Sequence, residues 1–111
     1  MLDDQSLATH ETPVQRQARD CAVEDWLGFL GHRWNACLIW HLSTGTKTFG
    51  ELAGMLEGVS AKVLTERLAG LEQRNLITRD VAAKFPRTVS YTLTGKGEQV
   101  LTIIRQIEHL T

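Results

Sequence analysis

The sequence predicts a mainly α-helical protein that carries one small β-hairpin. Two observations predict this class: apolar residues recur with helical spacing over most of the chain, and the spacing changes to strand-like alternation between residues 76 and 93. With 111 residues, of which 42% are hydrophobic, the chain can form one small core. Residues 1–12 are polar and are predicted to be a flexible tail before a single domain of residues 13–111.

The composition excludes several classes of protein. No apolar run has the length of a membrane span, and the N-terminal residues lack the basic and apolar blocks of a signal peptide. The two cysteines do not make a disulfide framework. We therefore expect a cytoplasmic protein without a membrane partner, associated with the nucleoid if it binds DNA.

The segment from Thr48 to Asn75 organises the chain as two helices joined by a short turn. Thr48 and Glu51 have the spacing of a capping box, which starts the first helix. Gly58 suits a left-handed stop, and Ser60 can cap the second helix, which ends at Asn75. The positions expected to face inward are apolar: Phe49, Leu52, Ala53 and Leu56, then Leu64, Leu68 and Leu71. Such a pair is the helix-turn-helix unit that presents its second helix to the DNA major groove.

Two further helices are predicted before this unit. The first covers residues 21–31, whose apolar face consists of Val23, Trp26, Leu27 and Leu30. Pro13 suits the first position of a helix, but residues 14–20 show no pattern that decides their structure. The second helix covers residues 34–43 and ends at Gly45. Their three tryptophans have apolar neighbours, so we expect them in a core or an interface rather than stacked on bases.

Strand spacing follows Asn75. Residues 77–81 and 89–93 alternate β-branched or aromatic residues with polar ones. The loop between them, Ala-Ala-Lys-Phe-Pro-Arg, places Lys84 and Arg87 at the tip of a hairpin. A basic hairpin directly after a helix-turn-helix describes a winged helix, whose wing lies along the phosphate backbone or in the neighbouring minor groove.

A last helix is predicted from Gly95 to about Leu110, with Thr94 as its cap. Its apolar face is wide for a chain of this size, so we expect it to pack with the helix of residues 13–31 and with their symmetry mates in a homodimer. The residues expected in this interface are Val23, Trp26, Leu27, Leu30, Val100, Ile103, Ile104 and Ile107. The alternative is that the helix only closes the core of its own subunit.

Charge is unevenly distributed along a chain whose net charge is −1. Residues 58–88 hold six basic and three acidic residues, a charge of +3, which leaves −4 for the rest of the chain. A local positive face on a nearly neutral body suits a selective DNA-binding protein. The alternative reading is a solvated helix and hairpin.

Several runs of residues together resemble the HxlR-type winged-helix transcription regulators. They extend in order from residue 21 to residue 97: Cys21-Ala22-Val23-Glu24, Leu30-Gly31-His32-Arg33-Trp34, Phe49-Gly50-Glu51-Leu52, Val59-Ser60, Leu64-Thr65-Glu66-Arg67-Leu68, Leu71-Glu72, Leu76-Ile77-Thr78-Arg79 and Val89-Ser90-Tyr91-Thr92-Leu93-Thr94-Gly95-Lys96-Gly97. The resemblance implies a dimeric bacterial DNA-binding regulator, related in architecture to MarR-type proteins.

The sequence departs from the family pattern at two places. Gly31-His32-Arg33-Trp34 stands where the family usually has Gly-Gly-Lys-Trp. Pro86-Arg87-Thr88-Val89-Ser90-Tyr91 stands where the usual wing reads Pro-Pro-Arg-Val-Glu-Tyr. The arginine therefore lies one position closer to the wing tip, and the glutamate before the tyrosine is absent, which bears on the contacts of the wing rather than on the fold.

The orientation of the second helix selects candidate DNA contacts. With its leucines inward, the residues expected near base edges or flanking phosphates are Ser60, Lys62, Thr65 and Glu66. Ala61 can touch a thymine methyl group, and Arg67 lies to the side, where it can hold a phosphate or pair with a carboxylate of its own subunit. The expected phosphate contacts outside this helix are Lys84, Arg87 and Thr48. The alternative for each charged residue is simple solubility.

The two cysteines have different expected roles. If a helix starts at Cys21, unpaired backbone N–H groups and Arg19 favour its thiolate, while Asp20 and Glu24 oppose it. Cys21 also resembles the sensing thiol of redox- and electrophile-responsive members of the family. The alternative is a small buried residue at the start of a helix. Cys37 has apolar neighbours and is expected to be an inert core thiol.

The function that this sequence supports is a transcriptional regulator that binds double-stranded DNA as a homodimer on a pseudo-palindromic operator. A redox or electrophile response through Cys21 is a further hypothesis, and the nature of any effector is open. The alternative function is a winged helix used only for protein–protein contact. We expect no enzyme and no cofactor, because the chain lacks a Gly-rich phosphate loop and a nucleophile elbow. Cys37 and His41 are spaced for metal ligation, but no third ligand is evident, so no metal is expected.

Overall fold

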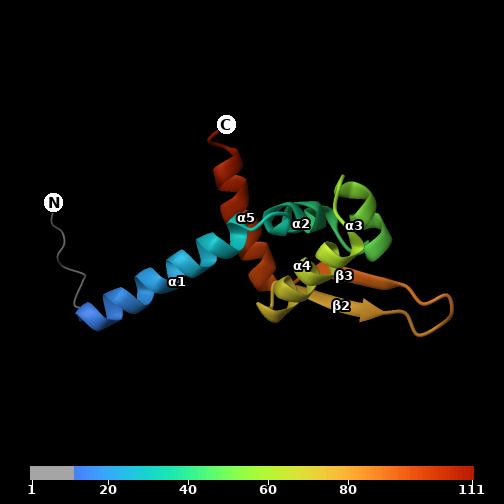
Figure 1. The fold of residues 1–111 in the computed structure, drawn as a ribbon, viewed down its shortest axis with the longest axis horizontal. Helices are drawn as coiled ribbons and strands as arrows, with labels where there is room; N and C mark the ends of the chain where they lie inside the picture. The colour runs from blue at the N-terminus through green and yellow to red at the C-terminus, as the bar shows by residue number, and fades with distance from the viewer. Residues whose placement is uncertain (1–11) are drawn as a thin grey trace. The chain divides into compact units, whose positions relative to one another are not determined.

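The computed structural model describes residues 12–111, apart from the side chains of residues 18 and 19, so most of the predicted tail lies outside the described residues. The chain divides into two units, residues 1–31 and residues 32–111. The first unit contains α1 (Pro13–Gly31). The second contains α2 (Asn35–His41), the short 3-10 helix η1 (Leu42–Thr44), β1 (Lys47–Thr48), α3 (Phe49–Met55), α4 (Ala61–Gln73), β2 (Ile77–Val81), β3 (Val89–Leu93) and α5 (Gly95–Glu108) (Figure 1). No helix within residues 12–111 has both the length and the apolar character needed to cross a membrane.

Helix α1 begins earlier than the apolar spacing indicated. Thr12 and Gln15 bond reciprocally, with Thr12 N donating to Gln15 Oε1 at 2.7 Å and Gln15 N donating to Thr12 Oγ1 at 3.1 Å. This capping box starts the helix at Pro13, and the helix continues without a break to Gly31. Residues 14–20, whose structure the sequence left open, are therefore helical, and Cys21 does not lie at the start of a helix, because a local cap at Thr12 rather than the apolar stripe sets where α1 begins.

The second unit begins with an unusual turn. Trp34 has φ +83°, in the left-handed region, so α2 starts at Asn35 rather than at Trp34. Leu38, Ile39 and Leu42 face the core, and Gly45, with φ +127°, ends the segment. The strand β1 was not predicted, because two residues are too few to show an alternation.

The helix-turn-helix follows the predicted local signals closely. Thr48 N donates to Glu51 Oε1 at 2.8 Å and Glu51 N donates to Thr48 Oγ1 at 3.1 Å, so the predicted capping box is present. Gly58 takes φ +91° in the turn, and Ser60 Oγ accepts from Val63 N at 3.1 Å at the start of α4. On α3 the apolar stripe is only partly buried: Leu52 and Leu56 lie in the core, Phe49 is half-buried and Ala53 is exposed.

The predicted hairpin is confirmed, and β1 joins it in a three-stranded antiparallel sheet of order β1-β3-β2. Its register pairs Ile77 with Leu93 and Val81 with Val89. Tyr91 lies between Arg79 on one side and Lys47 on the other, so these three side chains share one face of the sheet. The sheet therefore fixes the wing to the strand that leads directly into α3.

The core lies between the helices and this sheet. It contains Leu38, Ile39, Leu42, Leu52, Leu56, Leu64, Leu68, Leu71, Leu76, Ile77, Tyr91, Val100 and Leu101. Five of these residues lie in the helix-turn-helix, two on α3 and the turn after it and three on α4, and three more come from α2 and η1, so the helix-turn-helix contributes the largest share of the core. The predicted inward leucines of α4 are confirmed.

A tight junction joins the end of α4 to the start of α5. Asn75 takes φ +63°, which turns the chain out of α4 as predicted. Thr94 then bonds to this turn twice: its N donates to Leu76 O at 3.0 Å and its Oγ1 donates to Asn75 O at 2.6 Å. The same hydroxyl accepts from Gly97 N at 3.0 Å, which confirms Thr94 as the cap of α5. Gly97 packs so closely that a Cβ atom there would overlap the Leu76 carbonyl oxygen.

Gly97→Ala should therefore destabilise the protein, by about 1–3 kcal/mol, because the added methyl group must displace backbone at this junction. Gly95→Ala is the matched control, since a Cβ atom at Gly95 meets nothing within 4 Å. Urea unfolding followed by circular dichroism measures both variants. Equal stability of the two variants would show that the junction can relax without cost.

Candidate nucleic-acid interface

Helix α4 presents a polar surface over its N-terminal half. Leu64, Leu68 and Leu71 are fully buried, which fixes the rotation of the helix about its axis. The residues that this rotation exposes include five of the predicted contacts: Ser60, Ala61, Lys62, Thr65 and Glu66. They come together at the end of α4 that follows the turn, where a recognition helix approaches base edges.

The hydroxyl groups on this surface differ in what they can offer. Thr65 Oγ1 donates to Ala61 O at 2.8 Å, so in this rotamer the hydroxyl can accept a hydrogen bond but cannot donate a second one. Ser60 Oγ accepts from Val63 N, and its own proton is available to a phosphate or base acceptor. The same holds for Thr48, whose Oγ1 accepts from Glu51 N. The surface therefore combines two potential hydroxyl donors with one acceptor.

Arg67 makes a different contact from the two that we expected. It is half-buried, and its Nε donates to the carbonyl oxygen of Arg33 at 2.9 Å. The left-handed turn at Trp34 brings this carbonyl within reach, while the guanidinium carbon of Arg33 lies 4.4 Å from the centre of the Trp34 ring. Through this bond Arg67 ties α4 to the segment before α2, and a phosphate contact by the rest of its guanidinium group stays a prediction.

The loop between β2 and β3, residues 82–88, is called the wing loop here. Ala82 N donates to Thr88 O at 2.9 Å and closes it. Lys84 and Arg87 are both exposed, as a role in phosphate contact requires. Figure 1 shows the wing loop at the end of the hairpin farthest from α5. Phe85 lies between the two basic residues and is 92% exposed.

The residues predicted for the dimer interface differ in exposure: one is buried, and the others are half-buried or exposed. On α5, Val100 is buried within the single chain, so it is a core residue rather than a residue of an exposed interface. Ile103 and Ile107 are 51% and 56% exposed, and Ile104 is half-buried. On α1, Val23 and Leu27 are exposed, whereas Trp26 and Leu30 are half-buried. Trp26 packs edge-to-face on Phe29, with ring centres 6.0 Å apart.

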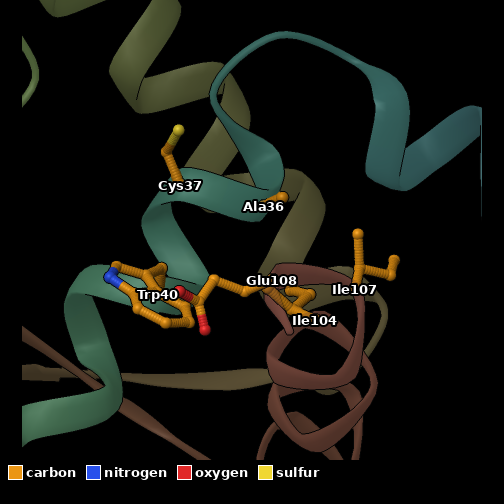
Figure 2. A pocket seen from close by; sticks show the side chains of 6 residues that line it. All are labelled: Ala36, Cys37, Trp40, Ile104, Ile107 and Glu108. Atoms are coloured by element: carbon orange, nitrogen blue, oxygen red, sulfur yellow. The ribbon is translucent and has the colours of Figure 1, made fainter. Parts of the chain in front are cut away.

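A shallow apolar pocket of about 250 Å³ lies between α2 and α5. Its lining residues are Ala36, Cys37, Trp40, Ile104, Ile107 and Glu108 (Figure 2). It extends the exposed apolar face of α5 onto α2. Trp40 is 39% exposed beside this pocket, so it is a surface residue rather than a core residue.

Both cysteines are free and exposed. The expectation that Cys37 is a core thiol is wrong: Leu38 and Ile39 occupy the inward side of α2, and Figure 2 shows the Cys37 sulfur pointing away from Trp40. The alternative that Cys21 is a small buried residue is also wrong. Because α1 starts at Pro13, Cys21 lies about two turns inside the helix, beyond the unpaired N–H groups that were expected to favour its thiolate. The side chain of Arg19 lies outside the described residues.

Within residues 12–111, no group of three or more His, Cys, Asp or Glu side chains could hold a metal ion.

Two residues of this surface were missed from the sequence. Arg33 holds α4 through its backbone, and a carbonyl contact leaves no signal in residue type. Phe85 did leave a signal, since a large apolar residue between two basic residues in a turn is unusual for a solvated loop.

A family model described as HxlR-like helix-turn-helix matches residues 29–111. The regulatory protein MalR of Fusobacterium mortiferum is 36% identical over 85 residues, which cover 76% of this chain and 80% of MalR. The HTH-type transcriptional regulator YodB of Bacillus subtilis is 36% identical over 86 residues, which cover 78% of this chain and 77% of YodB.

The solved structures that are similar to this chain are also those of regulators. The reduced form of YodB superposes with a TM-score of 0.69 at 32% identity and covers 89% of both chains. The reduced form of the redox regulator HypR superposes with a TM-score of 0.75 at 30% identity, over 79% of this chain and 87% of HypR. YodB has also been solved after diamide treatment, and HypR in an oxidised form.

Proposed function

The chain belongs to the HxlR-like helix-turn-helix family of transcriptional regulators, and from this membership we propose that it binds a specific sequence of double-stranded DNA. One observation carries the proposal: α4 buries its three leucines completely and leaves a polar N-terminal half exposed. The exposed half of α4 is polar and needs no partner to cover it, so its side chains are available to contact DNA.

In this proposal α4 enters the major groove and the wing loop contacts the flanking phosphates. The side chains near base edges or adjacent phosphates are those of Ser60, Lys62, Thr65 and Glu66. Ala61 lies at the N-terminal end of α4, where its methyl group can contact the methyl group of a thymine. Thr65 acts as an acceptor, which favours a base that presents an amino group. Lys84, Arg87 and the hydroxyl of Thr48 hold phosphates. Arg67 is assigned to positioning α4.

We further propose that the regulator is a homodimer. The exposed apolar side chains on α1 and α5 support this, because a monomer gains nothing from exposing Val23, Leu27, Ile103 and Ile107. A twofold axis relates two copies of α4, so the operator is pseudo-palindromic, with half-sites about one helical turn apart or a multiple of that distance. An interaction module that contacts only proteins would use the same fold, but the excess of positive charge over residues 58–88 favours DNA.

Replacing Lys62 and Thr65 together with alanine should weaken operator binding by at least about tenfold without changing the thermal unfolding temperature, because both side chains are exposed. A gel-shift assay with the DNA upstream of the protein's own operon measures this. Arg105→Ala is the charge control, since it removes one exposed cation from α5.

Salt separates DNA binding from protein interaction in the same assay. Several phosphate contacts per subunit should lower the affinity of the parent by about tenfold for each doubling of salt. Unaltered operator affinity of the double variant would contradict the assignment of α4. Complete absence of a specific shift by the parent would favour the protein-interaction alternative.

A response to oxidants through Cys21 is a second proposal, which the exposure of this thiol and the redox-regulator relatives support. Two Cys21 thiols of one dimer can lose two protons and two electrons to an oxidant such as diamide and join in a disulfide. A disulfide or an adduct at this position on α1 would alter the dimer and hence the spacing of the two α4 helices.

The oxidant response should disappear in Cys21→Ser and persist in Cys37→Ser, a matched control because that thiol is also exposed. Titration of each dimer with diamide, followed by operator gel shift and non-reducing electrophoresis, measures the response. Cys21→Ser that responds as the parent does would rule out sensing at this residue.

A further inference from the structure

The most exposed large apolar side chain described in the structure is that of Phe85, at 92%. It lies in the wing loop, and no packing role explains it, because its ring adds almost nothing to the buried core. Exposure of an aromatic ring to water is unfavourable, and its burial on binding is correspondingly favourable. The position therefore calls for a partner that covers the ring.

The wing loop holds Phe85 at a defined place. The last strand pair is Val81 with Val89, and the bond from Ala82 N to Thr88 O closes the loop directly above it. Thr88 Oγ1 donates to Pro86 O at 3.5 Å within the loop. Pro86 has a fixed φ and no backbone N–H group. Phe85 and Pro86 together therefore present an apolar tip that lacks one of the backbone hydrogen-bond donors that any other residue at position 86 would supply.

The surroundings of this tip indicate the chemistry of the partner. Lys84 precedes the ring and Arg87 follows Pro86, and both are exposed. An apolar ring between two cations suits a surface that combines phosphate with stacked apolar bases. A protein partner of the same kind would need an acidic surface around an apolar cavity.

The length of the hairpin is also suitable. Strands of five residues extend about 17 Å from the junction at the end of α4. Figure 1 shows both strands leaving the helices with the wing loop at their outer end. With α4 in the major groove, this reach carries the loop past one phosphate backbone to the adjacent minor groove.

We propose that Phe85 is an apolar wedge that enters the minor groove of the operator and partly unstacks one base step, with Lys84 and Arg87 on the two flanking phosphate backbones. Phenylalanine and proline are among the side chains that proteins insert between base steps in this groove. The inserted ring bends the DNA toward the major groove, and flexible pyrimidine–purine steps accept it most readily. This inference rests on the proposed DNA binding and adds a shape preference at positions that α4 does not read.

The test uses the full-length dimer and a duplex obtained by in vitro selection from a random-sequence library. Phe85→Ala removes the wedge, Phe85→Leu keeps an apolar side chain, and Lys84→Ala removes an adjacent charge but keeps the ring. Circular-permutation gel shifts measure the bend, and 2-aminopurine placed at each step under the wing reports unstacking by its fluorescence. Because Phe85 is almost fully exposed, the variants should fold as the parent does, which thermal unfolding checks.

Phe85→Ala should lower affinity roughly 5- to 100-fold, remove the fluorescence increase and straighten the duplex. It should leave the salt dependence unchanged, while Lys84→Ala should reduce the slope of log K against log salt by about 2 for the dimer and keep the fluorescence increase. Phe85→Leu should retain most of the bend. Salt-dependent, specific binding by Phe85→Ala with the bend and fluorescence of the parent would overturn the wedge and leave the proposed function standing.

Two other results would also overturn it. Loss of a concentration-dependent protein association in Phe85→Ala, with DNA binding intact, would assign the ring to a protein contact. Failure of the parent to select any duplex would remove the proposed function and the wedge together.

Discussion

Burial of three leucines fixes the rotation of α4 about its axis and so determines which of its side chains face the solvent. Leu64, Leu68 and Leu71 occupy one stripe of α4 and are removed completely from water. A rotation of α4 by one residue would expose a leucine and bury a charged or hydroxyl side chain, each at a cost of about 2 kcal/mol. The outward direction of Lys62 and Thr65 is therefore a consequence of core packing, and the proposed recognition surface needs no separate device to hold it.

The wing is fixed by a second constraint that begins where α4 ends. Asn75 turns the chain, Leu76 enters the core, and Thr94 with Gly97 closes on their carbonyl groups from the start of α5. The hairpin lies between these two points, and β1 connects it to the cap of α3 through its pairing with β3. Helix α4 and the wing loop thus belong to one packed unit. Arg67 adds a bond from α4 to the segment before α2 and so strengthens the same unit.

Much of this arrangement could be predicted because its signals are local. Thr48, Gly58, Ser60 and Thr94 each act through a cap or a turn within a few residues, and all four behave as the sequence indicated. The errors arose where distant partners or weak local signals decide. The cap of α1 lies in a polar stretch without an apolar pattern. The strand β1 forms only by pairing with β3, over forty residues away. Arg67 donates to the Arg33 carbonyl oxygen, which the turn at Trp34 brings within reach. Cys37 and Val100 were misplaced because an apolar neighbourhood in sequence does not say which side of a helix faces the core.

Cleavage of the operator by a tethered iron chelate shows whether the N-terminal end of α4 lies in the major groove of each half-site. The chelate is attached to Ala61→Cys in a chain whose two native cysteines are serine, and to Gln73→Cys at the far end of α4 for comparison. If α4 has this placement, residue 61 should give two centres of cleavage, about one helical turn or a multiple of that distance apart, and residue 73 should give much weaker cleavage. Equal cleavage from both positions, or none from residue 61 on a duplex that the protein shifts, would contradict it.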